Sequence, residues 1–89
     1  MTDRVQMIEA RLRAAFSPQE LLVKDQSHLH AGHAGAQDGR GHFDVMIVSR
    51  DFGDAGRLQR HRMVFDALGE LMDTDIHALR VRALTPEER

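Results

Sequence analysis

Hydrophobic and polar positions alternate along this 89-residue chain with two periods, one typical of helices and one typical of strands. The first apolar stripe has spacings of three and four, which place its members on one side of a helix. Its members are Val5, Ile8, Leu12, Ala15 and Phe16. Thr2 or Asp3 can cap this helix, and Ser17-Pro18 ends it, because the residue before proline avoids the helical region.

Three segments have the apolar runs or two-residue alternation that predict strands. The first covers residues 20–25, and the second begins at Phe43 and continues to Val48. The third covers residues 76–84, and strict alternation divides it into two faces. One face carries His77, Leu79, Val81 and Ala83, and the other carries Ala78, Arg80 and Arg82. Residues 26–41 are rich in Gly, Ala and His and predict a long loop, a kind of segment that is often functional in small domains.

A second helix is predicted from about residue 57 to residue 72, after a turn over residues 49–56. Thr85-Pro86 can begin a terminal helical stub, with Thr as the N-cap and Pro at the first position. The order is therefore αββαβ within a single domain of residues 1–89. We predict an α+β fold in which one three-stranded sheet is covered on one face by helices.

Composition narrows the chemistry that this chain can carry out. The formal net charge is −2, which does not favour strong non-specific binding to nucleic acid. The chain has no cysteine, so it forms no disulfide and offers no thiolate to a metal. No apolar run approaches the length of a transmembrane helix, and the first residues lack the apolar core of a signal peptide. We therefore expect a cytoplasmic protein that is not embedded in a membrane.

Six histidines supply the candidate metal ligands, since neutral imidazole is the commonest metal ligand in proteins. His28, His30 and His33 lie together in the predicted loop. They could chelate a metal, or they could form a polar stretch that binds added nickel or zinc without a function. His77, at the start of the third strand, is either a structural histidine bonded to the backbone or a metal ligand.

A group of basic residues marks the start of the second helix. Arg57, Arg60 and Arg62 predict a positive patch beside the positive end of the helix dipole, suited to phosphate or an acidic partner. A solvated charged face is the simpler alternative. Within Arg60-His61-Arg62 one residue must turn inward, and we expect it to be His61. The preceding Gly53–Gly56 matches the GxxG of KH loops only weakly, because Asp54 would repel phosphate, so a plain turn is favoured.

Seven short stretches, in order and with matching gaps, resemble the BolA family over nearly the whole chain. They are Val23-Lys24-Asp25-Gln26-Ser27, His30-Ala31-Gly32-His33, Gly41-His42-Phe43, Ile47-Val48-Ser49-Arg50-Asp51-Phe52, Leu58-Gln59-Arg60-His61-Arg62-Met63-Val64, Ile76-His77-Ala78-Leu79 and Thr85-Pro86-Glu87. The resemblance implies a fold like that of type II KH domains. It also implies a monothiol glutaredoxin as the partner, with which family members share a [2Fe–2S] cluster that glutathione helps to hold.

The same resemblance implies which residues would bind that cluster. His77 corresponds to the family's histidine ligand at the start of the last strand. The second ligand corresponds best to His30, three residues after Ser27, although His28 and His33 lie in the same loop. Some bacterial members are described as DNA-binding transcriptional regulators of cell morphology and stress response.

The predicted function is that of an adaptor in iron–sulfur cluster assembly, cluster trafficking or iron regulation. DNA-binding regulation through the KH-like fold and the arginine patch is the alternative, and a zinc- or nickel-binding histidine protein is a third possibility. No catalytic constellation is present in the sequence, so we expect no enzymatic activity. On its own the protein should be a monomer or weak homodimer that holds no stable cluster.

Overall fold

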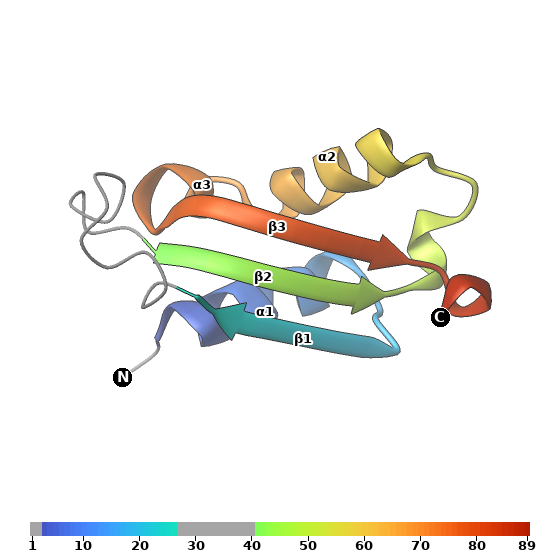
Figure 1. Ribbon diagram of the computed structural model, residues 1–89, viewed down its shortest axis with the longest axis horizontal. Helices are drawn as coiled ribbons and strands as arrows, with labels where there is room; N and C mark the ends of the chain where they lie inside the picture. Colours follow the sequence, from blue (N-terminus) through green and yellow to red (C-terminus); the bar gives the residue numbers. More distant parts are fainter. Residues whose placement is uncertain (1–2, 27–40) are drawn as a thin grey trace.

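The computed structural model describes residues 3–26 and 41–89, and Figure 1 shows their arrangement. In chain order the elements are α1 (Arg4–Ala15), β1 (Glu20–Asp25), β2 (Gly41–Val48), the 3-10 helix η3 (Arg50–Phe52), α2 (Arg57–Leu68), α3 (Leu71–Thr74), β3 (Ile76–Leu84) and the 3-10 helix η4 (Pro86–Glu88). This order confirms the predicted αββαβ pattern and adds short helical turns to it. The bounds of β1 and β3 are those predicted.

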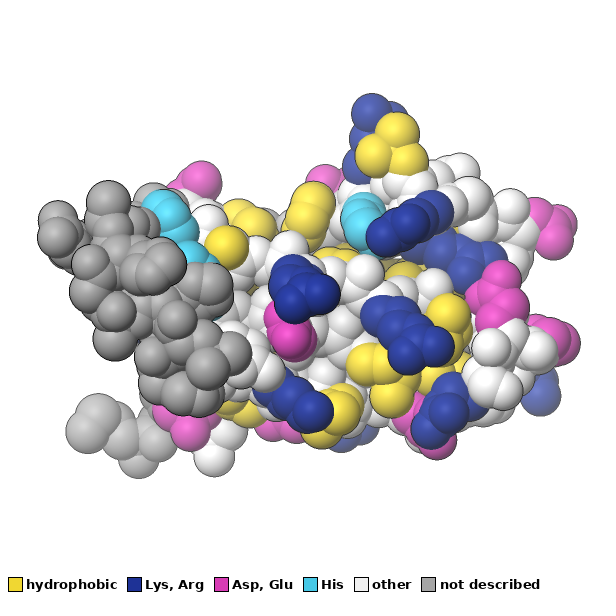
Figure 2. Space-filling view, viewed as in Figure 1, with side chains coloured by type: hydrophobic (Ala, Val, Ile, Leu, Met, Phe, Trp, Pro, Cys, Tyr) yellow, Lys and Arg dark blue, Asp and Glu magenta, His cyan; other side chains and the backbone are white. Residues whose placement is uncertain are grey.

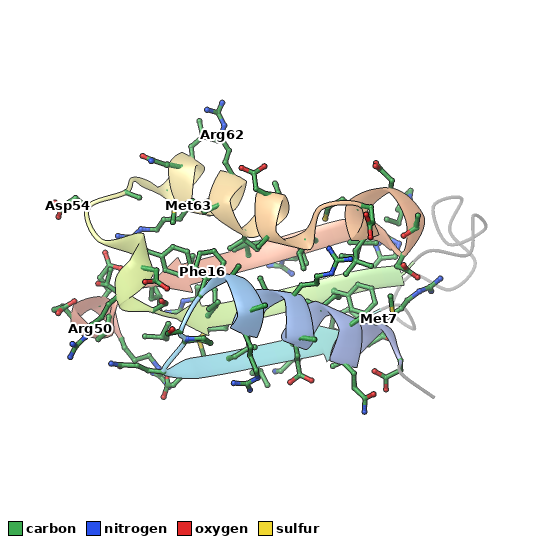
Figure 3. All side chains as sticks on the ribbon, turned by 180° about the vertical axis from the view of Figure 1, so that it is seen from behind. Met7, Phe16, Arg50, Asp54, Arg62 and Met63 are labelled. Carbon is green, nitrogen blue, oxygen red and sulfur yellow. The ribbon has the colours of Figure 1, made fainter. Side chains whose placement is uncertain are left out.

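The three strands form one mixed sheet in the order β1-β2-β3. Strand β2 pairs antiparallel with β1 and parallel with β3. The parallel pair needs a long crossover, which η3, α2 and α3 supply. Helices α1 and α2 lie behind the sheet in Figure 1 and in front of it in Figure 3, so they cover the same face. The α+β prediction is confirmed, and the arrangement is compatible with the type II KH-like description.

The core lies between the helices and the covered face of the sheet. In α1 the buried residues are Ile8 and Leu12, as the apolar stripe predicts. Asp3 fixes the start of this helix by accepting a hydrogen bond of 2.8 Å from the backbone N–H of Gln6. The other buried hydrophobic residues that make up the core cluster are Phe16, Val23, Phe43, Val45, Ile47, Phe52, Val64, Leu68, Leu71 and Ile76.

The predicted second helix is divided in two, which corrects its end at residue 72. Helix α2 ends at Leu68 because Gly69 takes a φ of +53°, a conformation open to glycine and costly for other residues. The backbone N–H of Gly69 still donates to the carbonyl of Phe65 at 3.0 Å. The chain then turns and forms α3, which lets Leu71 enter the core beside β3.

Strand β3 contains a β-bulge, so the prediction of strict alternation is wrong at its start. Gly41 pairs with Ile76, and the next residue, His42, pairs with Ala78. Strand β3 thus advances two residues while β2 advances one, and His77 is the extra residue. Ile76 is buried, while His77 is exposed and does not share the half-buried environment of Leu79, Val81 and Ala83. Strand β2 also begins two residues before the predicted Phe43.

The predicted helical start at Thr85-Pro86 is confirmed. Thr85 and Glu88 form a capping box in η4, in which the carboxylate of Glu88 accepts the N–H of Thr85 at 2.8 Å. Arg89 forms an ion pair with Glu20 of β1, which brings the end of the described chain across the sheet. Within residues 3–26 and 41–89, no helix is both long and apolar enough to span a membrane.

Candidate functional site

His77 stands at one end of the sheet with its side chain exposed to solvent. The bulge that places it there begins at Ile76, which is only 1% exposed and anchors the strand in the core. Bulges redirect side chains and occur frequently beside functional sites. An exposed imidazole on a well-anchored backbone can reach a metal group held by another molecule.

A second histidine, His42 of β2, contacts His77. The two ring centroids are 5.1 Å apart and the ring planes are inclined by 55°. Unlike the exposed His77, His42 has both ring nitrogens buried. His42 was not among the site residues predicted from the sequence. Alternation along β2 indicates that His42 lies on the same face of the sheet as Asp44 and Met46. The bulge that brings His77 beside it is visible only in the structure.

The ends of the undescribed segment 27–40 are attached near these two histidines. The N–H of Gln26 donates to the carbonyl of His42 at 2.7 Å, and the N–H of Gly41 donates to the carbonyl of Asp75 at 2.9 Å. The segment therefore leaves and rejoins the sheet at the end where His77 lies. His30 and His33, together with His28, are outside the described residues, and their roles as ligands stay predictions.

Arg60 was predicted to face solvent or a partner, and this is wrong: its side chain turns inward and is only 12% exposed. Its guanidinium donates to the carbonyl of Ala55 at 2.7 Å and to the carbonyl of Ala83 at 3.1 Å. It also forms a two-point ion pair with Glu88, with N–O distances of 2.5 and 3.2 Å. Arg60 thus ties α2 to β3 and η4. The expectation that His61 would be the inward residue is wrong in this respect, since His61 is half-buried at the surface.

The other two arginines of the predicted patch, Arg57 and Arg62, are exposed, as expected, but only Arg57 lines a groove. Arg62 points away from the body of the molecule (Figure 3). Arg57 lines two grooves, one of about 590 Å³ that extends over all three strands and one of about 610 Å³ between the start of α2 and strand β3. His61 and Arg82 line both grooves as well. The basic surface is therefore built from Arg57 and β3, and its function in binding stays a prediction.

The uncovered face of the sheet is also basic. Lysine and arginine side chains are spread over this face in Figure 2, with few acidic side chains between them. The strand register places Lys24, Asp44 and Arg80 in one row across the sheet. Asp44 and Arg80 are 4.0 Å apart, which makes a weak contact because Arg80 is 88% exposed. A chain with a net charge of −2 thus carries a locally positive face that can orient an acidic partner.

Two carboxyl groups have pKa values below their ordinary range. The guanidinium of Arg60 and the backbone N–H of Thr85 lower the pKa of Glu88 from 4.5 to about 2. Hydrogen bonds from Thr74 and Arg4 lower the pKa of Asp75. Both carboxylates join separate elements. Glu88 of η4 forms an ion pair with Arg60 of α2, and Asp75 forms one of 3.1 Å with Arg4 of α1. Neither shift marks a catalytic acid or base.

The donor atoms present fit a shared metal group better than one held by this chain alone. Among residues 3–26 and 41–89, no three His, Asp or Glu side chains converge as a metal site. The whole sequence contains no cysteine. A [2Fe–2S] cluster takes four ligands, usually thiolates, and accepts histidine in their place. His77 fits the role of one such ligand, provided that another molecule supplies the thiolates.

The fold and surfaces together describe a small α+β domain with a mixed three-stranded sheet, an exposed histidine at one end and a basic open face. Residues 12–88 match the family model described as BolA-like protein. The chain is 39% identical over 89 residues to "Protein BOLA1, chloroplastic" of Arabidopsis thaliana, covering 97% of this chain and 56% of that protein. It is 42% identical over 81 residues to "DNA-binding transcriptional regulator BolA" of Escherichia coli, covering 91% and 74%. The chain belongs to the BolA family.

A solved structure agrees with this assignment. The BolA domain of SufE1 from Arabidopsis thaliana superposes with a TM-score of 0.87 at 35% sequence identity, and the match covers 100% of this chain and 99% of that one. The names of these relatives are those of regulators or of BolA proteins, and none describes a reaction. Because the chain spans just over half of the chloroplastic relative, the activity and location of that whole protein do not transfer to it. The cytoplasmic location stays a prediction.

Proposed function

We propose that this protein is an adaptor that binds a monothiol glutaredoxin and shares a [2Fe–2S] cluster with it, in cluster assembly, cluster trafficking or iron regulation. His77 is the ligand from this chain that the described residues support. A histidine from the loop, His30 or His33, is the second ligand. The glutaredoxin and glutathione supply the thiolates, and the cluster supplies the electron-transfer or iron-delivery chemistry.

The observation that carries this proposal is the exposed His77 on a β-bulge beside a buried anchor. A histidine kept only for packing is usually buried, whereas His77 is exposed. A ligand for a group on another molecule must instead present a nitrogen to solvent. The basic open face supports the same reading, because it favours approach of an acidic partner on the side where β2 and β3 are uncovered.

Co-expression with a monothiol glutaredoxin tests the proposal. The purified complex should show visible absorption and circular dichroism from a [2Fe–2S] cluster, with a spectrum different from that of the glutaredoxin alone. His77→Ala should abolish or change this difference. Arg13→Ala is the control, because Arg13 is exposed on α1, on the helix-covered side of the sheet, and should leave the spectrum unchanged. An unchanged spectrum in His77→Ala would contradict the proposal.

DNA binding is the alternative function, and two observations favour it. Relatives from Escherichia coli and Haemophilus influenzae carry the name of a DNA-binding transcriptional regulator. The groove between α2 and β3 is lined by the basic Arg57 and Arg82, next to Gly56 where the backbone is accessible. The same surface would meet phosphates of a bound duplex.

Salt dependence separates this alternative from non-specific attraction. If the groove binds DNA, Arg57→Gln and Arg82→Gln should each reduce the slope of log affinity against log salt by about 1. Arg62→Gln, which alters an arginine that points away from the groove, should leave the slope unchanged. Equal slopes for all three variants would remove the groove as the DNA site.

A further inference from the structure

His42 contacts His77, and the proposed function gives His42 no role. We propose that His42 is a positioning residue for His77: its ring packs against the ring of His77 and fixes the direction in which the exposed imidazole points. This inference rests on the proposed function, in which His77 binds the shared cluster, and it names what prepares His77 for that role.

The geometry of the two rings is that of a packed aromatic pair. Their centroids are 5.1 Å apart and their planes are tilted by 55°. Aromatic rings prefer such offset or tilted contacts at centroid separations of about 4.5–7 Å. The contact therefore restricts the rotation of His77 about its side-chain bonds, although the residue itself is exposed.

Burial assigns the two histidines different tasks. Both ring nitrogens of His42 are buried, so they do not face a metal group brought by another molecule. His77 is exposed and can do so. Only one of the pair is therefore suited to be a ligand, and the other forms the wall against which the ligand rests. His42 therefore differs in role from the loop histidines His30 and His33, which the sequence predicts as candidates for the second ligand.

The backbone around His42 is fixed more firmly than that around His77. His42 belongs to the central strand β2, and its carbonyl accepts the N–H of Gln26 at 2.7 Å. His77 is the extra residue of the bulge, where the regular pairing of the strands is interrupted. The neighbour of His42 across the sheet is Ala78, whose methyl group is too small to hold a ring in place. The ring of His42 is thus a rigid support for the ring of His77.

Such support has a known consequence for metal ligands. Groups that orient a ligand are important for affinity, and their loss typically weakens metal binding by about 10- to 100-fold. Orientation before binding also removes part of the entropy cost of fixing a free side chain. His42 therefore contributes to retention of the shared cluster without touching it.

The first test uses the metal-free chain and nuclear magnetic resonance. In the wild-type protein, the three-bond couplings of the His77 side chain should show one dominant rotamer. His42→Leu, which fills the site without a ring, should give averaged couplings, and His42→Phe, which keeps a ring, should restore the dominant rotamer. Averaged couplings already in the wild type, or equal couplings in all three proteins, would overturn the inference.

The second test uses the complex with a monothiol glutaredoxin and measures retention of the cluster against a chelator by visible circular dichroism. His42→Leu should weaken retention by about 10-fold or more, and His42→Phe should recover most of the loss. Arg13→Ala, at an exposed position of α1 on the helix-covered side of the sheet, serves as the control and should retain the cluster like the wild type. Full retention by His42→Leu, or an equal loss in the Leu and Phe variants, would overturn the inference.

The two tests distinguish failure of the inference from failure of the proposed function. If His77→Ala leaves the cluster spectrum unchanged, the proposed function fails, and the couplings of His77 still decide whether His42 orients it. If His77→Ala removes the cluster signal while His42→Leu changes neither the couplings nor the retention, the proposed function stands and the positioning role of His42 is wrong.

Discussion

Replacing Arg60 with alanine should destabilise the protein far more than its place in a run of surface arginines would suggest. The side chain is 12% exposed, and its guanidinium reaches the turn before α2, strand β3 and η4 at once. The substitution removes donors to the carbonyls of Ala55 and Ala83, which lie at 2.7 and 3.1 Å. It also leaves the carboxylate of Glu88 without its arginine.

The size of the effect follows from the two carbonyl bonds. Each net hydrogen bond in a protein contributes about 1 kcal/mol, and somewhat more when the donor is charged. Their loss should therefore lower the free energy of unfolding by about 2–3 kcal/mol. In a domain of this length, 1 kcal/mol corresponds to about 4–8 °C, so the melting temperature should fall by about 10–20 °C.

Urea unfolding followed by far-ultraviolet circular dichroism measures this change, since the chain has no tryptophan or tyrosine to report by fluorescence. Arg62→Ala is the matched control, because Arg62 is exposed two residues further along the same helix. It should change the free energy of unfolding by less than about 0.5 kcal/mol. Equal stabilities of the two variants would refute the structural role assigned to Arg60.

Three further predictions concern other parts of the molecule. Because the folded-state pKa of Glu88 is about 2 and its ordinary value is 4.5, its contribution to stability is present above pH 4.5 and is lost as the pH falls toward 2; acid titrations of Glu88→Gln should show a smaller loss over this window. Gly69→Ala should lower the free energy of unfolding by about 1–2 kcal/mol, measured by urea unfolding, since Gly69 has a φ of +53°. In the complex with glutaredoxin, His30→Ala should alter the visible circular dichroism more than His28→Ala or His33→Ala; the reverse order for His33 would contradict the assignment of His30.

Local patterns predicted the regular parts of this fold well. The alternation of apolar and polar residues located β1 and β3, and the stripe through Ile8 and Leu12 identified the buried side of α1. These signals are local, since each depends on residues a few positions apart. The break at Gly69 was missed because the apolar pattern continues beyond it through Leu71 and Met72, although a glycine often follows the last residue of a helix.

The site was harder to predict because it depends on pairing between distant strands. Alternation placed His77 with the half-buried Leu79, but at the bulge opposite Gly41 and His42 its side chain is exposed. No property of residues 76–84 alone indicates where pairing is interrupted. The role of Arg60 was missed for the same reason, since its partners Ala83 and Glu88 are more than 20 residues away in the chain.

The central claim, that His77 is a ligand of a shared cluster, is tested most directly by pulsed electron paramagnetic resonance. The chain is labelled with nitrogen-15 in its histidines, combined with unlabelled monothiol glutaredoxin, and the [2Fe–2S] cluster of the complex is reduced. A nitrogen-15 coupling of the size of a directly bound imidazole should appear, and His77→Ala should remove it or reduce it to that of a loop histidine. A spectrum with no such coupling, or one that His77→Ala leaves unchanged, would contradict the claim.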